Sequence, residues 1–417
     1  MRRAWNNVSC CSSRIANLTC TDHVVDSVAK PYSWHIACGR QTLYQGNRHS
    51  GSCGKFPWSI YLTKITTAIT SGVGPDVIEI GNTWAPTFAD SGGFVPWTPK
   101  MFQAIGGENK FLKTSMEVTT APGKPIISVP FLGQTWVLEY NKALFKKAGI
   151  TAPPRTWTQF MADAKKLSNP AKGIYGVDVP IAVNSALQTW DWIMFRQEGG
   201  NYYEHGKPSL TLNANVSTLT NFIKWVYPDR IVNPALVGDS TGTLGTTEFE
   251  RGQAAMFFTQ APQMAVEHPA KYGIGYVPLP AKMPHGGAAI MSHVAGENLV
   301  IFKNSKHLSE DLEFIKFLTS PQEQELINKN MFELPVTKAG LKTAYFQTPA
   351  EKIFGQILAK YAAPMPTEAS SATLFNDVGA ATITLMRDDL SNHNISVSQV
   401  RSALNSVQQT IEAESGS

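Results

Sequence analysis

From about residue 56 onward, apolar positions along the chain follow either helical or strand spacing. Residues 61–69 repeat apolar side chains at the spacing of an amphipathic helix, and the glycines and proline of residues 71–75 end it. Residues 76–80 and 125–130 are short segments rich in β-branched side chains, which predicts strands. Residues 140–150 are predicted to be helical, with Gly149 as the glycine that follows the helix.

Two later helices begin with a capping box, in which the first and fourth residues satisfy each other's backbone groups. Thr156 with Gln159 begins a helix that we expect to reach Leu167, and Ser320 with Glu323 begins another. Further strands are predicted at 254–258, 273–277 and 299–302, and the chain is mostly helical from about residue 347. Strands of about five residues between longer helices indicate an α/β protein with largely parallel sheets. In such proteins, ligands bind at the carboxyl ends of strands.

Residues 1–55 show neither the helical nor the strand spacing of apolar side chains. All five cysteines lie between Cys10 and Cys53, and this odd, clustered set fits neither a disulfide framework nor the paired spacing of a zinc site. Only six residues separate Arg2-Arg3 from Cys10, which is too short for the apolar part of a signal peptide. We therefore interpret residues 1–55 as an atypical, not native-like N-terminal segment without an intact signal peptide as written.

Length and charge narrow the classes of partner. The 417 residues predict two or three domains, and 36 Lys and Arg against 32 Asp and Glu give a net charge of +4. Cationic runs are no longer than Lys146-Lys147 or Lys165-Lys166. This argues against nucleic acid or an anionic membrane surface as the main partner, because both require clustered cations. No stretch of 18 consecutive apolar residues occurs, so no segment is predicted to span a bilayer.

Amide, hydroxyl and indole side chains follow the predicted strands or precede a glycine turn. They are Asn82, Thr83, Trp84, Gln134, Trp136, Trp190, Trp192 and Gln260. A sugar ring stacks a C–H face on an indole, and its hydroxyls need fixed polar partners, because each buried unpaired group costs about 1–3 kcal/mol. The pattern therefore predicts a neutral, hydroxyl-rich ligand. An alternative stays open for Trp84, Trp136 and Trp192, which are also compatible with a place in the core.

Several segments together resemble one known family. They are residues 75–78, 88–92, 129–130, 139–150, 153–157, 199–200, 252–256 and 314–320 with Gln322. Through them, about residues 56–417 resemble the family 1 extracellular solute-binding proteins of ABC sugar importers, which are relatives of maltose-binding protein. The family's first strand is represented at best by residues 32–35, and the long helix that follows it in the family is absent.

The resemblance implies an α/β fold of the type II periplasmic-binding-protein class. Two lobes would be joined by crossover hinge strands, with a ligand cleft between them. Lobe 1 would comprise residues 56–133 and 296–337, and lobe 2 residues 138–292 and 338–417. The family's sugar-contacting positions correspond to the polar and aromatic residues given above and, more loosely, to Glu297 and Phe375, although Phe375 is also typical of helix packing.

The function that the resemblance implies is extracellular capture of a neutral mono- or oligosaccharide. The protein would deliver this sugar to the permease subunits of an ABC transporter in the membrane. It would work as a monomer, without metal, cofactor or nucleic acid, and would be lipid-anchored at the cell surface or periplasmic. No catalytic residue is expected.

Two other functions remain open. A binding protein for an amino acid or polyamine would need charged partners for its ligand, and Asp191 and Glu297 are the acidic residues near the predicted site segments. A glycoside-acting enzyme would need two carboxylates across a cleft, for which Asp90, Asp191 and Glu297 are available. Ser240 lies in a Gly-x-Ser-x-Gly pattern, but the strand before it and the helix after it that a nucleophile requires are not predicted.

Overall fold

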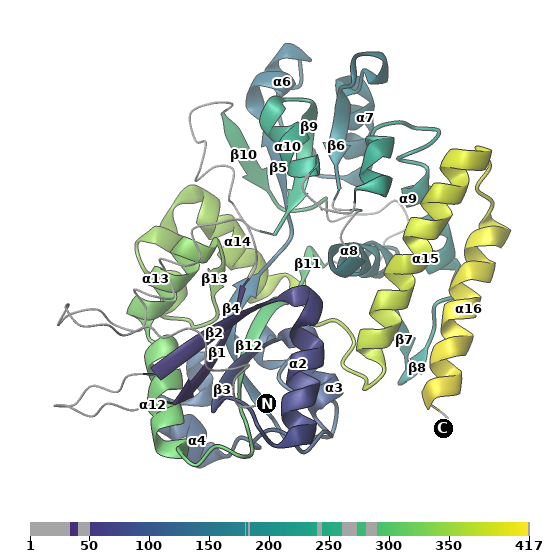
Figure 1. Cartoon of the computed structure of the whole chain (residues 1–417). Coiled ribbons are helices and arrows are strands. Elements are labelled where there is room, and N and C mark those ends of the chain that lie inside the picture. The colour runs from purple at the N-terminus through teal and green to yellow at the C-terminus, as the bar shows by residue number, and fades with distance from the viewer. Residues whose placement is uncertain are drawn as a thin grey trace. The chain divides into compact units, whose positions relative to one another are not determined.

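The computed structural model describes residues 34–40, 51–179, 181, 184–239, 244–260, 273–280 and 290–415 (Figure 1). These residues form two compact units. Unit 1 consists of the described residues up to Gln134 together with Ala295–Thr348, and unit 2 of those in Thr135–Val294 and Pro349–Ser417. The chain passes between the units after Gln134, Val294 and Thr348. Residues 338–348 thus lie in unit 1, whereas the sequence assigned them to the second lobe.

The sheet of unit 1 has six strands among the described residues, in the order β13-β4-β12-β3-β1-β2. Their bounds are β1 (Trp34–Arg40), β2 (Gly51–Pro57), β3 (Val77–Gly81), β4 (Ser128–Gln134), β12 (Ala295–Ile301) and β13 (Leu334–Pro335). β1 pairs with β2 and β3, so β1 and most of β2 occupy part of the segment that lacked a clear period in the sequence.

Every described strand pair in this sheet is antiparallel, so the prediction of largely parallel sheets is wrong for unit 1. β12 lies between β3 and β4 and runs against both, which makes β3 and β4 parallel to each other. β12 enters the sheet after the chain has passed through unit 2. The alternation of strands and helices along the sequence does not show that a strand from such a distant segment joins this sheet.

Helices cover both faces of this sheet (Figure 1). On one face, α2 (Trp58–Ser71) and α3 (Ala85–Phe88) pack through Tyr61, Ile65 and Phe88 against Ile80. On the other face, the core contains residues of α4 (Pro99–Ala104), α12 (Leu308–Leu318) and α13 (Pro321–Met331). Shorter elements are η2 (Asn82–Trp84), η3 (Glu108–Lys110), α5 (Lys113–Met116), η6 (Gly340–Lys342) and η7 (Tyr345–Gln347).

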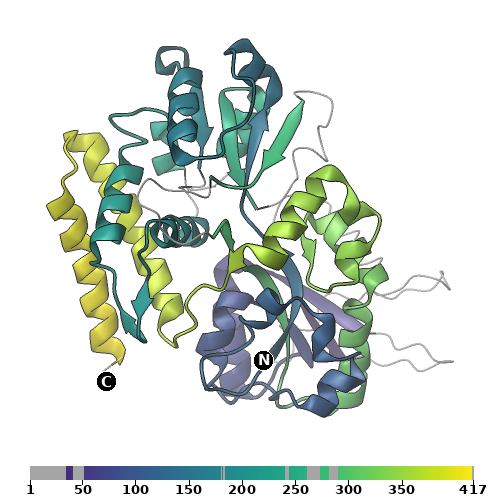
Figure 2. The same ribbon diagram turned by 180° about the vertical axis from the view of Figure 1, so that it is seen from behind.

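Unit 2 contains a four-stranded sheet in the order β10-β5-β9-β6, in which β6 and β9 are parallel. The strands are β5 (Val137–Asn141), β6 (Tyr175–Asp178), β9 (Ala254–Thr259) and β10 (Ile274–Val277). Its longer helices are α6 (Lys142–Lys147), α7 (Trp157–Leu167), α8 (Asn184–Gln197), α9 (Asn213–Ile223), α10 (Leu244–Arg251), α14 (Pro349–Lys360), α15 (Ser371–Asn392) and α16 (Val397–Ser415). Both views show α15 and α16 side by side (Figure 2).

Small elements complete unit 2. They are η4 (Pro170–Lys172), η5 (Pro234–Gly238), β7 (Tyr203–Glu204), β8 (Lys207–Pro208), β11 (Ser292–His293) and β14 (Ala362–Ala363). Across the part of the chain that the structure describes, no helix combines the length and apolar character needed to cross a bilayer.

The predicted helix starts are confirmed by their side-chain caps. The Thr156 hydroxyl accepts a hydrogen bond from the Gln159 backbone N–H at 3.2 Å, and Ser320 accepts from Glu323 at 3.4 Å. The predicted helix at 140–150 is wrong at its start, because residues up to Asn141 belong to β5. The Asn141 side chain then caps α6, and Gly149 follows that helix with a φ of 66°.

We expect Gly176→Ala to destabilise unit 2. A Cβ at this position in β6 would lie 2.2 Å from the Ala164 backbone oxygen of α7, so strand and helix would have to separate. The free energy of unfolding should fall by about 1–3 kcal/mol, measured by urea denaturation with tryptophan fluorescence. Gly238→Ala is the matched control, because a Cβ there meets nothing within 4 Å. Equal stabilities of the two variants would contradict the predicted clash.

Candidate functional site

The carboxyl end of β3 presents three of the predicted ligand residues in succession. Asn82, Thr83 and Trp84 form η2 directly after Gly81, the last residue of the strand. Asn82 is buried, whereas Thr83 and Trp84 are half-buried. The Trp84 ring lies 6.2 Å from the Tyr61 ring at an interplanar angle of 44°. Trp84 therefore packs against the core of unit 1 while part of its ring remains exposed.

Gln134 lies at the corresponding end of β4. It is the last residue of that strand, is half-buried, and pairs with Ala295 at the start of β12. Its side-chain N–H donates to the carboxylate of Glu333, which directly precedes β13. One donor of the Gln134 amide is therefore used within unit 1.

Three glutamates lie near one another at this end of the sheet, where Glu79 acts on Glu297 and Glu333. In the antiparallel register of β3 and β12, Glu297 lies opposite Gly81 and Glu79 lies opposite Leu299. Glu79 and Glu297 therefore share one face of the sheet in a diagonal arrangement. Glu333 joins them because β13 pairs with β4.

Burial is the main cause of the raised pKa values of Glu297 and Glu333. Burial, then the negative charges of Glu333 and Glu79, raise the pKa of Glu297 well above its usual range. Burial and the charge of Glu79 likewise raise the pKa of Glu333, against the opposing effect of the hydrogen bond from Gln134. These carboxyls are thus biased toward the neutral form, in which each offers an O–H donor as well as acceptors.

The four remaining predicted aromatic residues lie in the core of unit 2. Their exposed fractions are 2% for Trp136, 0% for Trp190, 2% for Trp192 and 1% for Phe375. A ring without an exposed face cannot stack on a sugar, so we remove these four from the candidate ligand set. The alternative role in the core, left open for two of the tryptophans, accounts for their positions.

Contacts within unit 2 explain the burial of these rings. Trp190 lies 4.2 Å from the Phe258 ring and 6.0 Å from the Trp157 ring. The Trp136 and Trp192 indoles also have internal hydrogen-bond acceptors. Trp136 Nε1 donates to the Thr189 hydroxyl at 3.2 Å, and Trp192 Nε1 donates to Asn201 Oδ1 at 3.1 Å. The Phe375 ring lies 5.6 Å from the Tyr202 ring.

Gln260 is the predicted ligand residue of unit 2 that keeps partial exposure. It directly follows β9, at the carboxyl end of the parallel β6–β9 pair. The candidate set is therefore Asn82, Thr83, Trp84, Gln134 and Glu297 in unit 1, and Gln260 in unit 2.

Glu79 and Glu333 were missed in the sequence. An acidic residue within an apolar strand could have drawn attention to Glu79, whereas the place of Glu333 depends on β13 joining the sheet.

The carboxylates considered for catalysis lie in different surroundings. Asp90 is exposed and forms an ion pair with Lys124 at 2.8 Å. Asp191 is buried in α8 and accepts a hydrogen bond from the Thr382 hydroxyl at 2.7 Å. Burial raises the pKa of Asp191 to about 8. Ser240 lies outside the described residues. Within the described ranges, no group of three His, Cys, Asp or Glu side chains is placed to hold a metal ion.

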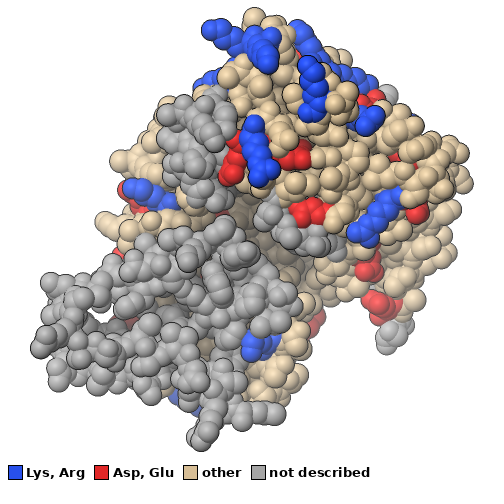
Figure 3. Space-filling model, turned by 45° about the horizontal axis from the view of Figure 1, so that its top comes forward, with Lys and Arg blue, Asp and Glu red and all other residues tan. Residues whose placement is uncertain are grey.

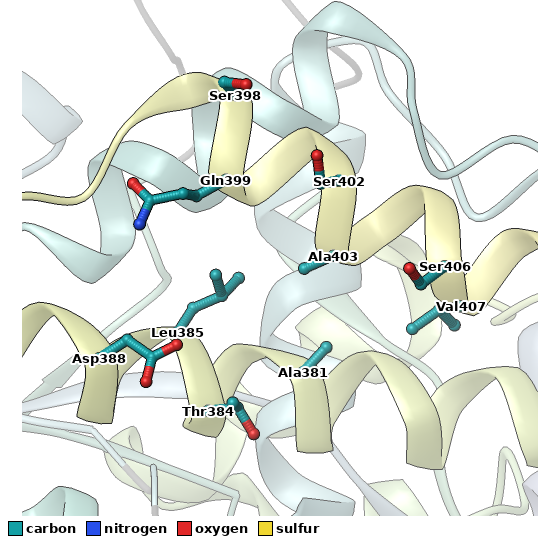
Figure 4. Close-up of a pocket in the computed structure, with 10 residues that line it drawn as sticks. All are labelled: Ala381, Thr384, Leu385, Asp388, Ser398, Gln399, Ser402, Ala403, Ser406 and Val407. Atoms are coloured by element: carbon teal, nitrogen blue, oxygen red, sulfur yellow. The ribbon is translucent and has the colours of Figure 1, made fainter.

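An open groove of about 500 Å³ lies between α15 and α16 of unit 2 (Figure 4). Small and hydroxyl-bearing side chains such as Ala381, Ser402 and Ser406 line it, together with Leu385 and Val407. None of the predicted ligand residues contributes to its lining. The groove is therefore separate from the candidate site.

Comparisons with known proteins give one family and one fold. A family model described as bacterial extracellular solute-binding protein matches residues 55–325. A binding protein of Brucella abortus is 25% identical over 71% of this chain and 70% of its own length. The sn-glycerol-3-phosphate-binding periplasmic protein of Yersinia enterocolitica is 25% identical over 65% of this chain and 63% of its own.

Among solved structures, the sugar-binding protein MalE of Xanthomonas citri is similar with a TM-score of 0.72. It shares 19% identity, and the match covers 86% of this chain and 89% of that one. This likeness confirms the expected two-lobe periplasmic-binding-protein-like fold.

We expect the stability of unit 2 to fall as the pH rises from about 5 to 8, in part through Glu139. This residue of β5 is buried, its Oε1 accepts a hydrogen bond from the Tyr276 hydroxyl at 3.2 Å, and burial raises its pKa to about 8. A pKa raised by folding stabilises the protein below the unfolded pKa, and this stabilisation is lost as the pH rises through the folded pKa. Each pKa unit corresponds to about 1.4 kcal/mol.

Glu139→Gln keeps an acceptor for Tyr276 but cannot ionise, so it should flatten this pH dependence. Urea denaturation at several pH values measures the slope. Asp163→Asn serves as the control, because Asp163 is partly exposed and should change the slope much less. An unchanged slope in Glu139→Gln would show that the carboxyl ionises freely in the folded protein.

Proposed function

Because the chain belongs to the family of bacterial extracellular solute-binding proteins, whose members work with ABC permeases, we propose that it captures a neutral mono- or oligosaccharide for import. The observation that carries this proposal is the end of β3 in unit 1. There, a partly exposed indole, that of Trp84, directly follows Asn82 and Thr83, which have an amide and a hydroxyl side chain. An indole next to uncharged polar groups suits a ring that has one C–H face and a rim of hydroxyls.

The glutamates of unit 1 support a ligand without negative charge. Glu79, Glu297 and Glu333 act on one another at the same end of the sheet. A phosphate or carboxylate placed beside them would be repelled whenever they ionise. One relative binds sn-glycerol 3-phosphate, and one protein of the same fold binds a sugar. Because glycerol 3-phosphate is an anion, we favour a sugar as the ligand of this chain.

The same glutamates favour one alternative. A cationic amine, as in a polyamine or an amino acid, would be attracted by carboxylates that repel one another. This alternative predicts that binding strengthens as the pH rises, because deprotonated glutamates hold an amine more tightly. A neutral sugar predicts no such gain, because it carries no charge that would favour the ionised form.

The proposed mechanism is closure of the two units on the sugar. The three passages of the chain between the units would act as the hinge, and a permease would read the closed form. Unit 1 would contribute Asn82, Thr83, Trp84, Gln134 and Glu297, and unit 2 would contribute Gln260. The protein would work as a monomer without metal, cofactor, nucleic acid or catalysis. It would be lipid-anchored at the cell surface or periplasmic.

A thermal-shift panel tests the ligand class. We expect maltose, maltotriose or another neutral sugar to raise the melting temperature, because a ligand at 100 times its Kd adds about 2.7 kcal/mol of stability. Sodium glycerol 3-phosphate, glutamine and spermidine are the comparison ligands. A shift with spermidine alone, growing with pH, would replace the sugar by the amine alternative. The bound sugar should be recovered unchanged, and release of reducing ends would reveal an enzyme.

Trp84→Ala should weaken sugar binding by about 1–3 kcal/mol, measured by isothermal titration with the sugar identified in the panel. Trp84→Phe, which keeps a ring against Tyr61, should lose less. Trp192→Ala is the contrasting variant, because its buried ring supports the core. It should lower the free energy of unfolding by about 3–5 kcal/mol and leave the affinity of the folded protein unchanged. Loss of affinity in Trp192→Ala with none in Trp84→Ala would reverse our assignment of these two rings.

A further inference from the structure

The positive charge of this protein is concentrated in one segment of unit 2. Residues 142–172 contain seven cations and a single acidic residue, Asp163, a net charge of +6 in a chain whose total is +4. The rest of the chain is therefore slightly negative. We name these cations the basic surface: Lys142, Lys146, Lys147, Arg155, Lys165, Lys166 and Lys172. All seven are exposed.

Five of these cations lie at three helix ends, whereas Lys142 begins α6 and Arg155 precedes α7. Lys146 and Lys147 lie in the last turn of α6, Lys165 and Lys166 in the last turn of α7, and Lys172 ends η4. A Cβ at Gly149, just after α6, would lie 3.9 Å from Lys166 Nζ, so the ends of α6 and α7 meet. Figure 3 shows Lys and Arg side chains gathered over the end of unit 2 that carries these helices.

Helix dipoles and neighbouring carboxylates give a structural role to some of these cations, but not to most of them. Cations at helix C-termini stabilise the helix dipole, each by less than about 1 kcal/mol at an exposed position. Lys165 forms an ion pair with Asp229 at 2.8 Å. Asp163 is half-buried, and burial raises its pKa against the lowering effect of the Lys166 charge. Among the described residues, Asp229 and Asp163 thus act as acidic partners of the basic surface.

The residues around these cations favour a membrane over a protein partner. Stable protein interfaces contain a buried apolar centre with aromatic or large aliphatic side chains. The exposed large hydrophobic residues in the described part of the chain are Leu62, Val73, Leu308, Leu326, Tyr361 and Val397, and none belongs to the segment 142–172. Exposed neighbours of the basic surface, such as Ala143, Thr151 and Thr158, are small or polar.

We propose that the basic surface rests reversibly on anionic phospholipid. Attraction of several lysines to a charged bilayer requires no fixed register and no apolar centre. The individual runs are too short for the sequence to predict such a surface, because it depends on Lys166 of α7 reaching the end of α6. This inference concerns a surface that contains none of the candidate ligand residues, so it does not depend on the identity of the ligand.

Vesicle co-sedimentation of the full chain tests this proposal. Wild-type protein should bind vesicles that contain phosphatidylglycerol at 50 mM salt, and should be released at 0.5 M NaCl, where exposed charges are screened. It should ignore vesicles of phosphatidylcholine alone. The variant Lys146→Gln/Lys147→Gln/Lys166→Gln should lose about 100-fold in partitioning, since each lysine contributes about fivefold.

The matched control is Lys100→Gln/Lys303→Gln/Lys306→Gln, which removes the same charge from exposed positions of unit 1. It should partition nearly as wild type does, and both variants should keep the wild-type melting temperature. Equal losses in the two variants, or equal binding to the two kinds of vesicle, would overturn the proposal. Binding to polyglutamate without binding to phosphatidylglycerol vesicles would also overturn it and would identify an acidic protein face as the partner.

Discussion

The antiparallel insertion of β12 between β3 and β4 is the constraint on which the candidate site of unit 1 depends. This one strand contributes backbone hydrogen bonds to two neighbours that are remote from it in sequence. Its register fixes Glu297 opposite Gly81, and Gly81 directly precedes Asn82–Trp84. The same strand fixes Ala295 opposite Gln134. A slip of one residue would turn Glu297 to the opposite face of the sheet. Gln134 and Glu297 are therefore held by a backbone ladder, and Asn82–Trp84 directly follow a strand of the same ladder.

Burial divides the aromatic residues into two roles. In unit 2, Trp190 packs against Phe258 and Trp157, and this cluster is stabilised by removing large rings from water. In unit 1, Trp84 packs against Tyr61 and keeps partial exposure. The same side chain thus supports the fold in one place and is available for recognition in the other. Its exposed area, rather than its identity, makes the difference.

Burial also determines what the acidic residues can do. Glu139 and Asp191 each have a hydroxyl donor and lie inside unit 2, where a raised pKa is a matter of stability. Glu297 and Glu333 have raised pKa values for the same reason, but they lie at the strand ends beside the candidate ligand residues. There, the preference for the neutral form changes the ligand that the site favours. One physical effect therefore weakens the fold at high pH in unit 2 and, in the proposed site, favours neutral carboxyls that both donate and accept hydrogen bonds.

The sequence by itself determined the family and several local elements. Capping by Thr156 and Ser320, the glycine after α6 and the short strands depend on neighbouring residues, so their patterns were sufficient. The tertiary structure decided which distant segments meet. It placed β12 antiparallel in unit 1, buried Trp136, Trp190, Trp192 and Phe375, brought Glu333 to Glu79 and Glu297, and joined the cations of α6 and α7. Strand pairing, exposure and charge clustering arise from contacts between residues far apart in the chain, and spacing along one sequence does not encode those distances directly.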